Sequence, residues 1–109
     1  MYEVKENQRI LLDGTKITTF AREIYNCNIL SVEAGTTGYM GGDSGHGGRT
    51  YFRITDEGST DMTVLTSRNK FGLESVEVFL GGDTELETII TALKFIIKTL
   101  DDQRKEIHD

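Results

Sequence analysis

The chain has 109 residues, a formal net charge of −6, 37% apolar residues and 28% charged residues. This length suits one folded domain, residues 1–109. The acidic balance argues against binding of a nucleic-acid polymer through its phosphate backbone. The single cysteine, Cys27, cannot form an internal disulfide, and no apolar run reaches the ~18 residues that span a membrane. The first residues lack the pattern of a signal peptide, so we expect a cytoplasmic protein with no membrane partner.

The first quarter of the chain predicts a short arm and then a helix. Residues 9–12 form an apolar run that the turn signal Asp13-Gly14 ends, which indicates a short strand or an irregular arm. Residues 15–25 carry apolar side chains at helical spacing, with Thr15 as N-cap and asparagines near the end. The apolar positions are Ile17, Phe20, Ala21, Ile24 and Tyr25.

Four strands are expected in the middle of the chain, because apolar and polar residues alternate there. They span 29–34, 50–55, 61–66 and 75–80, with a hairpin loop at 56–59. In the second of them, Phe52 and Ile54 are expected to face the core, and Tyr51 and Arg53 to face away.

A long amphipathic helix is predicted to follow. Thr84 and Glu87 have the spacing of a capping box, and a tail over 101–109 is expected to fray or to project into solvent. The apolar stripe of this helix comprises Leu86, Ile89, Ile90, Leu93, Ile96, Ile97 and Leu100. The predicted fold is α+β: an antiparallel β-sheet of four to six strands, with a short N-terminal and a long C-terminal helix packed on one face. Phe95 lies off the stripe and leaves apolar surface for a partner, so we expect a homo-oligomer, a dimer or higher.

The most unusual stretch is the glycine loop, residues 35–50, in which seven of sixteen residues are glycine. Glycine removes side chains where another molecule approaches the backbone, and its positive φ lets N–H groups converge on an anion. Arg49 offers a bidentate fork to phosphate, and Thr50 adds a donor. An aromatic side chain could stack a base. We therefore interpret the loop as a binding site for a small phosphorylated ligand. The candidate residues are Arg22, Tyr39, Gly42, Asp43, His46, Gly47, Gly48, Arg49, Thr50, Asn69 and Phe71.

Other chemistries are weaker on sequence grounds. The residues 42–45 repeat the Gly-Asp-Ser-Gly of trypsin-like proteases, but a chain of this length cannot supply the two barrels of that fold. Asp43 and His46 are two possible metal ligands, which Glu33 or Asp61 would have to complete. Walker and Rossmann loops are excluded by pattern, because a strand rather than a helix follows the glycines. The residues 81–84 are a second anion-binding candidate at a helix start. A purely structural role for the glycine loop also remains open.

The segment from Leu30 through the glycine loop to Phe52 resembles the first Thoeris anti-defence family of phages, and the likeness extends to Asp61-Met62 and to residues 81–83. The resemblance implies a sponge: a protein that sequesters a cyclic ADP-ribose signal without cleaving it, in the host cytoplasm. It also implies oligomers, and for some members cyclic oligonucleotide ligands at a separate site. No catalytic residue, metal or cofactor is implied. The alternatives are a small phosphodiesterase or hydrolase using Asp43 and His46, and a structural oligomeric phage protein.

Overall fold

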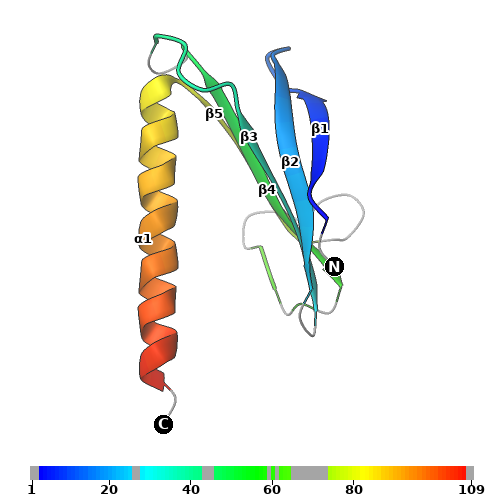
Figure 1. Ribbon diagram of the computed structural model, residues 1–109, viewed down its shortest axis with the longest axis vertical. Coiled ribbons are helices and arrows are strands. Elements are labelled where there is room, and N and C mark those ends of the chain that lie inside the picture. Colours follow the sequence, from blue (N-terminus) through cyan, green and yellow to red (C-terminus); the bar gives the residue numbers. More distant parts are fainter. Residues whose placement is uncertain are drawn as a thin grey trace.

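The computed structural model describes residues 3–25, 28–42, 46–58, 60, 62–64 and 74–107. It consists of a five-stranded antiparallel sheet followed by one long helix (Figure 1). The α+β class and the antiparallel sheet expected from the sequence are confirmed. The elements are β1 (Lys5–Ile10), β2 (Lys16–Tyr25), β3 (Ile29–Thr36), β4 (Arg49–Gly58), β5 (Ser75–Gly81) and α1 (Asp83–Ile107).

The expected helix over residues 15–25 is wrong, because these residues form β2. The strand pairs with β1 on one side and β3 on the other. Its helical spacing is ambiguous: Phe20 and Ile24 lie on one face of the strand, and Ile17 and Ala21 lie on the other. Pairing with two neighbours, together with a run rich in β-branched residues, decides for the strand. The turn before it is closed by Gly14 at φ 89°.

The expected strand over 61–66 is also not observed. Residues 62–64 lie outside any strand, and 61 and 65–66 lie outside the described residues. β4 instead continues through Gly58, over most of the predicted loop at 56–59, and pairs directly with β5. The strands over 29–34, 50–55 and 75–80 are confirmed.

The register of the strands gives the sheet two different faces. One face, here called the apolar face, carries Phe20, Ile24, Leu30, Val32, Ala34, Phe52, Ile54, Val76, Val78 and Leu80. The opposite face, here called the network face, carries the buried residues Ile17, Thr19, Ser31, Glu33, Tyr51 and Thr55. The prediction that Phe52 and Ile54 point into the core and Tyr51 away from it is therefore wrong: Tyr51 is 5% exposed and packs with Leu11 and Ile17.

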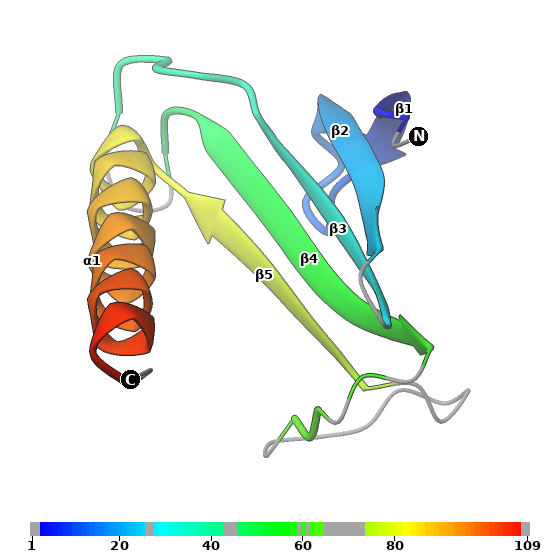
Figure 2. The same cartoon turned by 60° about the horizontal axis from the view of Figure 1, so that its bottom comes forward.

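Helix α1 begins beside the end of β5 and then diverges from the sheet (Figures 1 and 2). It lies on the side of the apolar face but does not cover it. Of its apolar stripe, Leu86 near the first turn is buried, whereas Ile90, Ile97 and Leu100 are exposed. The helix begins one residue before the expected N-cap and runs to Ile107. Residues 101–107 therefore do not fray, and residues 102–105 are exposed, in line with the other expectation, that the tail projects into solvent.

Candidate ligand-binding loop

The glycine loop joins β3 to β4, and its two ends are pinned together. The Thr37 N–H donates to the Arg49 carbonyl at 2.9 Å, and the Arg49 N–H donates to Thr37 Oγ1 at 2.8 Å. The hydroxyls of Thr36 and Thr50 lie 3.0 Å apart. These contacts continue the β3–β4 pairing into the loop. Residues 43–45 lie outside the described part of the chain.

The backbone donors of the loop converge on a carboxylate of the same chain, that of Asp83. It accepts hydrogen bonds from the N–H groups of Met40 (3.0 Å), Gly41 (2.8 Å), Gly42 (3.3 Å) and Gly48 (2.8 Å). These donors come from both described arms of the loop, residues 40–42 on the β3 side and residue 48 on the β4 side. The sequence predicted that these donors would bind a small phosphorylated ligand; in this structure they bind a side chain of the same chain that is 35 or more residues away.

Two further backbone bonds attach the loop to the start of α1. The Asp83 N–H donates to the Gly42 carbonyl at 2.8 Å, and the Gly82 N–H donates to the Gly48 carbonyl at 2.8 Å. We call the Asp83 carboxylate contacts and these two bonds the Asp83 bracket. Because Asp83 is the first residue of the helix, the bracket fixes where and in which direction α1 leaves the sheet.

Close approach within the bracket explains the glycines. A Cβ on Gly48 would lie 1.9 Å from the Gly38 carbonyl oxygen, and one on Gly42 would lie 2.6 Å from the Gly47 nitrogen. Gly47 also has φ 74°, and a Cβ there would lie 2.2 Å from the Gly42 oxygen. Side chains would therefore push the arms apart and away from Asp83. Hydrogen bonds from Gly48 and Met40, with smaller effects from Gly41 and Gly42, lower the pKa of the Asp83 carboxyl, so the bracket keeps a negative charge.

Arg49, which was predicted to bind a phosphate, forms its hydrogen bonds with other residues of the same chain. Its Nε donates to Asp13 at 2.6 Å, and its Nη1 donates to the carbonyls of Gly47 (3.0 Å) and Gly48 (3.2 Å). The hydrogen bond from Arg49 is the main cause that lowers the pKa of Asp13 to about 2, with the Thr15 contacts adding to it. Arg49 thus ties the loop to the β1–β2 turn.

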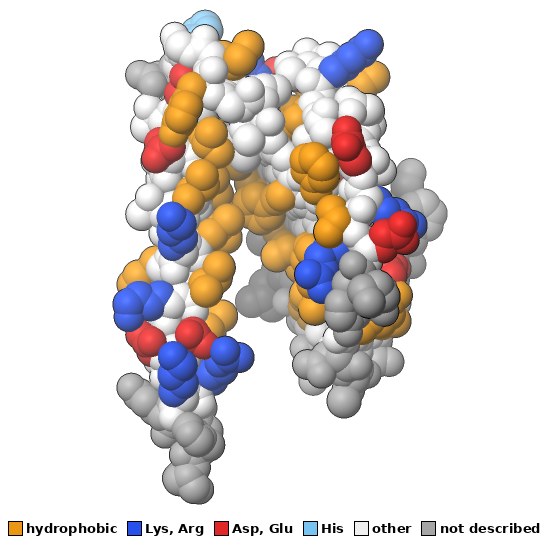
Figure 3. Space-filling view, viewed as in Figure 1, with side chains coloured by type: hydrophobic (Ala, Val, Ile, Leu, Met, Phe, Trp, Pro, Cys, Tyr) orange, Lys and Arg blue, Asp and Glu red, His pale blue; other side chains and the backbone are white. Residues whose placement is uncertain are grey.

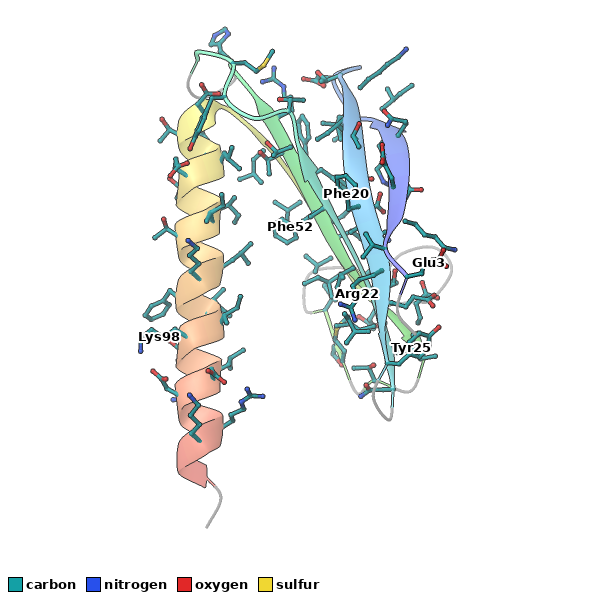
Figure 4. All side chains as sticks on the ribbon, viewed as in Figure 1. Glu3, Phe20, Arg22, Tyr25, Phe52 and Lys98 are labelled. Atoms are coloured by element: carbon teal, nitrogen blue, oxygen red, sulfur yellow. The ribbon has the colours of Figure 1, made fainter. Side chains whose placement is uncertain are left out.

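The other predicted site residues fall into four groups. Tyr39 and His46 are exposed on the loop, and Tyr39 is 62% exposed next to the exposed Met40. Thr50 is buried against Thr36. Arg22 lies on β2 at a distance from the loop, as Figure 4 shows. Asp43, Asn69 and Phe71 lie outside the described residues.

Sequence reasoning missed a buried charge network on the network face. Glu33 is 3% exposed and accepts hydrogen bonds from Arg9 Nε (2.6 Å) and Nη2 (2.8 Å), from Arg53 (3.1 Å) and from the Thr19 hydroxyl (2.5 Å). Chiefly because of the Arg9 bonds, and also because of Thr19 and Arg53, the pKa of Glu33 falls to about 2 despite burial.

Arg9 also lies over the ring of Tyr51, 5.0 Å from its centroid. Burial, and then the 2.5 Å hydrogen bond to Glu77, raise the pKa of Tyr51 to about 12. A cavity of about 190 Å³ lies beside Arg9, Tyr51 and Phe79. The polar residues that alternate along β3 and β4 could have indicated a polar face of the sheet. The partners of these residues could not be predicted, because they depend on how the strands pair.

The described residues contain no group of three or more His, Cys, Asp or Glu side chains placed to hold a metal ion. Glu33, one of the two residues that could have completed the hypothetical metal site, accepts hydrogen bonds from Arg9, Arg53 and Thr19 instead. Asp43 and Asp61 lie outside the described residues. Within those residues, no helix has the length and apolarity that crossing a membrane requires.

Comparison with known proteins gives no relative: no family model, no curated protein and no solved structure matches the chain.

Proposed function

We propose that the chain is a non-catalytic binding protein that captures a small cyclic nucleotide-type signal, of the cyclic ADP-ribose class, in the cytoplasm of an infected bacterium. It would withhold the signal from anti-phage defence. Cyclic oligonucleotides are a further ligand class for the same role. Binding without cleavage needs affinity and slow release, and it does not need a nucleophile.

The observation that carries this proposal is that residues 40–42 and 48 of the loop are hydrogen-bonded to Asp83, while recognition groups beside them are exposed. The Asp83 bracket fixes the backbone of residues 40–42 and 48 without a ligand, so binding there would cost less conformational entropy. Tyr39, Met40 and His46 remain exposed on this ordered loop. Figure 3 shows a histidine and hydrophobic side chains at the end of the molecule that carries the loop.

The bracket changes which groups would contact the ligand. The N–H groups of Met40, Gly41, Gly42 and Gly48 already bind Asp83, so a phosphate would have to displace a carboxylate to use them. We therefore assign recognition to the outer side chains of the loop. Tyr39 would stack on the base, a contact worth about 1–3 kcal/mol, and His46 would donate to a phosphate oxygen.

The test is the fate of the ligand. Purified protein is incubated with cyclic ADP-ribose isomers and with cyclic di- and trinucleotides, and depletion from the filtrate is measured. The protein is then heated and the released molecule identified by mass spectrometry. We expect depletion and intact release. Tyr39→Ala should weaken binding about 5- to 150-fold, the equivalent of that stacking energy. Tyr25→Ala, which removes an exposed tyrosine from β2, is the matched control.

A hydrolysed product would instead favour the phosphodiesterase alternative with Asp43 and His46. Depletion of no ligand would favour a structural oligomeric protein. The structural oligomeric protein is supported by an observation of its own: Phe20 and Ile24 on the apolar face, and Ile97 and Leu100 on the stripe of α1, are exposed in a single chain.

A further inference from the structure

The cavity of about 190 Å³ on the network face takes no part in the Asp83 bracket. Its walls come from β1 and the turn after it, from β4 and from β5, although β1 and β5 are the two edge strands of the sheet. The end of β1 and the turn therefore bend over the network face toward β5. The ion pair of Arg49 with Asp13, at 2.6 Å, ties this turn to β4. The lining includes Arg9, Leu11, Leu12, Tyr51, Glu77 and Phe79.

The floor of the cavity is apolar and belongs to the packed core. Leu11 and Tyr51 are buried and form the core cluster together with Ile17. Phe79 is partly buried against the same cluster. Leu12, the next residue after Leu11, also lines the cavity although it is 92% exposed. The cavity therefore exists without a ligand, and one of its walls is an apolar side chain that is open to solvent, a combination typical of small-molecule sites.

Two opposite charges contact Tyr51 at this cavity. The Arg9 guanidinium lies over the ring, 5.0 Å from its centroid, and the Glu77 carboxylate accepts a hydrogen bond from the hydroxyl at 2.5 Å. Arg9 binds Glu33 through Nε and Nη2, and Glu77 binds Tyr51 through Oε2. Among the described residues, Arg9 Nη1 and Glu77 Oε1 have no hydrogen-bond partner. One cationic donor and one anionic acceptor are thus available beside a single tyrosine side chain.

Charge and size restrict the ligands that fit this cavity. A phosphate or another simple anion would be repelled by Glu77, and the charge of Arg9 is already offset by Glu33. A simple cation would be repelled by Arg9 in turn. A zwitterion satisfies both groups. The cavity is also smaller than the about 300–1,000 Å³ of pockets that hold drug-sized ligands, so its size suits a single amino acid better than a cyclic nucleotide.

We infer that this cavity binds a free α-amino acid that has an apolar side chain. Its carboxylate binds Arg9 and its ammonium group binds Glu77, while its side chain lies against the apolar wall that includes Leu12. A free amino acid carries both charges on one carbon atom, so both can reach groups that flank a single tyrosine. The charged ends of a peptide are farther apart. The inference is independent of the proposed cyclic-nucleotide site, because it uses neither Tyr39 nor His46.

Titration of the isotope-labelled full chain with L-leucine, followed by the amide NMR spectrum, is the first arm of the test. We expect a dissociation constant of about 1 mM or below, with shifts at the amides of Leu11 and Phe79. Isocaproate lacks the ammonium group, isoamylamine lacks the carboxylate, and glycine lacks the side chain. Each should bind at least about 10-fold more weakly than L-leucine. No shifts with L-leucine, or equal affinity for isocaproate, would overturn the inference.

The second arm uses variants at exposed positions, because a change at Arg9 would also leave Glu33 without its main partner. Glu77→Gln keeps an acceptor for the tyrosine hydroxyl but removes the charge. It should weaken L-leucine about 10-fold and strengthen isocaproate. Leu12→Ala should weaken L-leucine about 10-fold. Leu100→Ala, which changes an exposed leucine on α1, is the matched control and should bind as the wild type does. Wild-type affinity in Glu77→Gln, or equal affinities in the two leucine variants, would overturn the inference.

Discussion

The two faces of the sheet are stabilised in different ways. On the network face, the chain satisfies its own groups: Glu33 binds Arg9 and Arg53, and Tyr51 is buried beside them. On the apolar face, large side chains such as Phe20 and Ile24 remain exposed. A five-stranded sheet with one helix has enough side chains to close one face but, with the helix held away, not both.

The difference shows what the glycine loop contributes to the fold. The loop residues Met40, Gly41, Gly42 and Gly48 bind the Asp83 carboxylate, and the start of α1 is thereby attached to the loop. At Gly48 and Gly47 the backbone of Gly38 and Gly42 lies so close that a side chain would not fit, which is why glycine stands at these two positions.

The largest expected effect is on the network face. Glu33→Gln removes the charge that compensates Arg9 and Arg53, and breaking a buried ion pair in this way costs about 3–5 kcal/mol. Urea denaturation followed by circular dichroism measures it. Glu57→Gln, an exposed change on β4, should stay within about 0.5 kcal/mol. Equal effects of the two variants would contradict a structural role for the network.

Acid should weaken the same face. The pKa of Glu33 is about 2 in the folded chain against an ordinary value of 4.5. Its contribution is therefore fully present above pH 4.5 and is lost as the pH falls through 2, a difference of about 3 kcal/mol. The unfolding free energy at pH 6 and pH 3 tests this, with Glu33→Gln showing a flatter dependence. Parallel pH profiles of wild type and variant would contradict the assignment.

The next effect is on the bracket. Gly48→Ala would place a methyl group 1.9 Å from the Gly38 oxygen, so the loop must shift and its bond to Asp83 must weaken. We expect a loss of about 2 kcal/mol. Gly58→Ala is the matched control, because its Cβ would meet only Ile29 Cδ1 at 4.0 Å. Thermal denaturation of both variants should separate them clearly; a Gly48→Ala protein as stable as the control would disprove the close packing of the loop.

If the apolar face binds a partner, the Tm should depend on the protein concentration. If a second copy covers it, a tenfold rise in concentration raises the Tm by about 3–5 °C. Phe20→Ser should reduce this dependence, whereas Glu33→Gln should lower the Tm equally at every concentration. Differential scanning fluorimetry over a hundredfold range of concentration provides the measurement. A Tm that does not change with concentration would place no partner on this face.

The smallest effect is expected on the outer side of α1. Lys98→Ala removes an exposed i,i+4 pair with Asp102 and should cost about 0.3–0.5 kcal/mol. High salt should remove most of this difference, since the pair is open to solvent. A loss above 1 kcal/mol in chemical denaturation would mean that this side of the helix is also covered.

Local patterns predicted part of the fold. The alternation in Ile29–Thr36 and Ser75–Gly81 indicated strands, and the stripe after Asp83 indicated the helix. The segment Lys16–Tyr25 was misread because it is apolar on both faces, which satisfies a helical spacing as well as a strand. Strand pairing, which the local sequence does not display, decides between them.

The binding site in the glycine loop stays a prediction, and the sequence did not indicate which group of the chain its donors contact. The glycines indicated an anion, and the loop does converge on one. The sequence could not show that this anion is Asp83, because the contact joins segments about 40 residues apart through the β3–β4–β5 meander. The Glu33 network was hidden for the same reason, since Arg9 is 24 residues away from Glu33.

The most direct test of the account is native-state hydrogen exchange at the amides of Met40, Gly41, Gly42 and Gly48. The Asp83 bracket predicts that they are protected without any added ligand, and that Asp83→Ala removes the protection while the amides in β3 and β4 keep theirs. Exchange of these four amides at unprotected rates in the wild-type protein would contradict the bracket. In that case these four N–H groups would be available to bind an external phosphate.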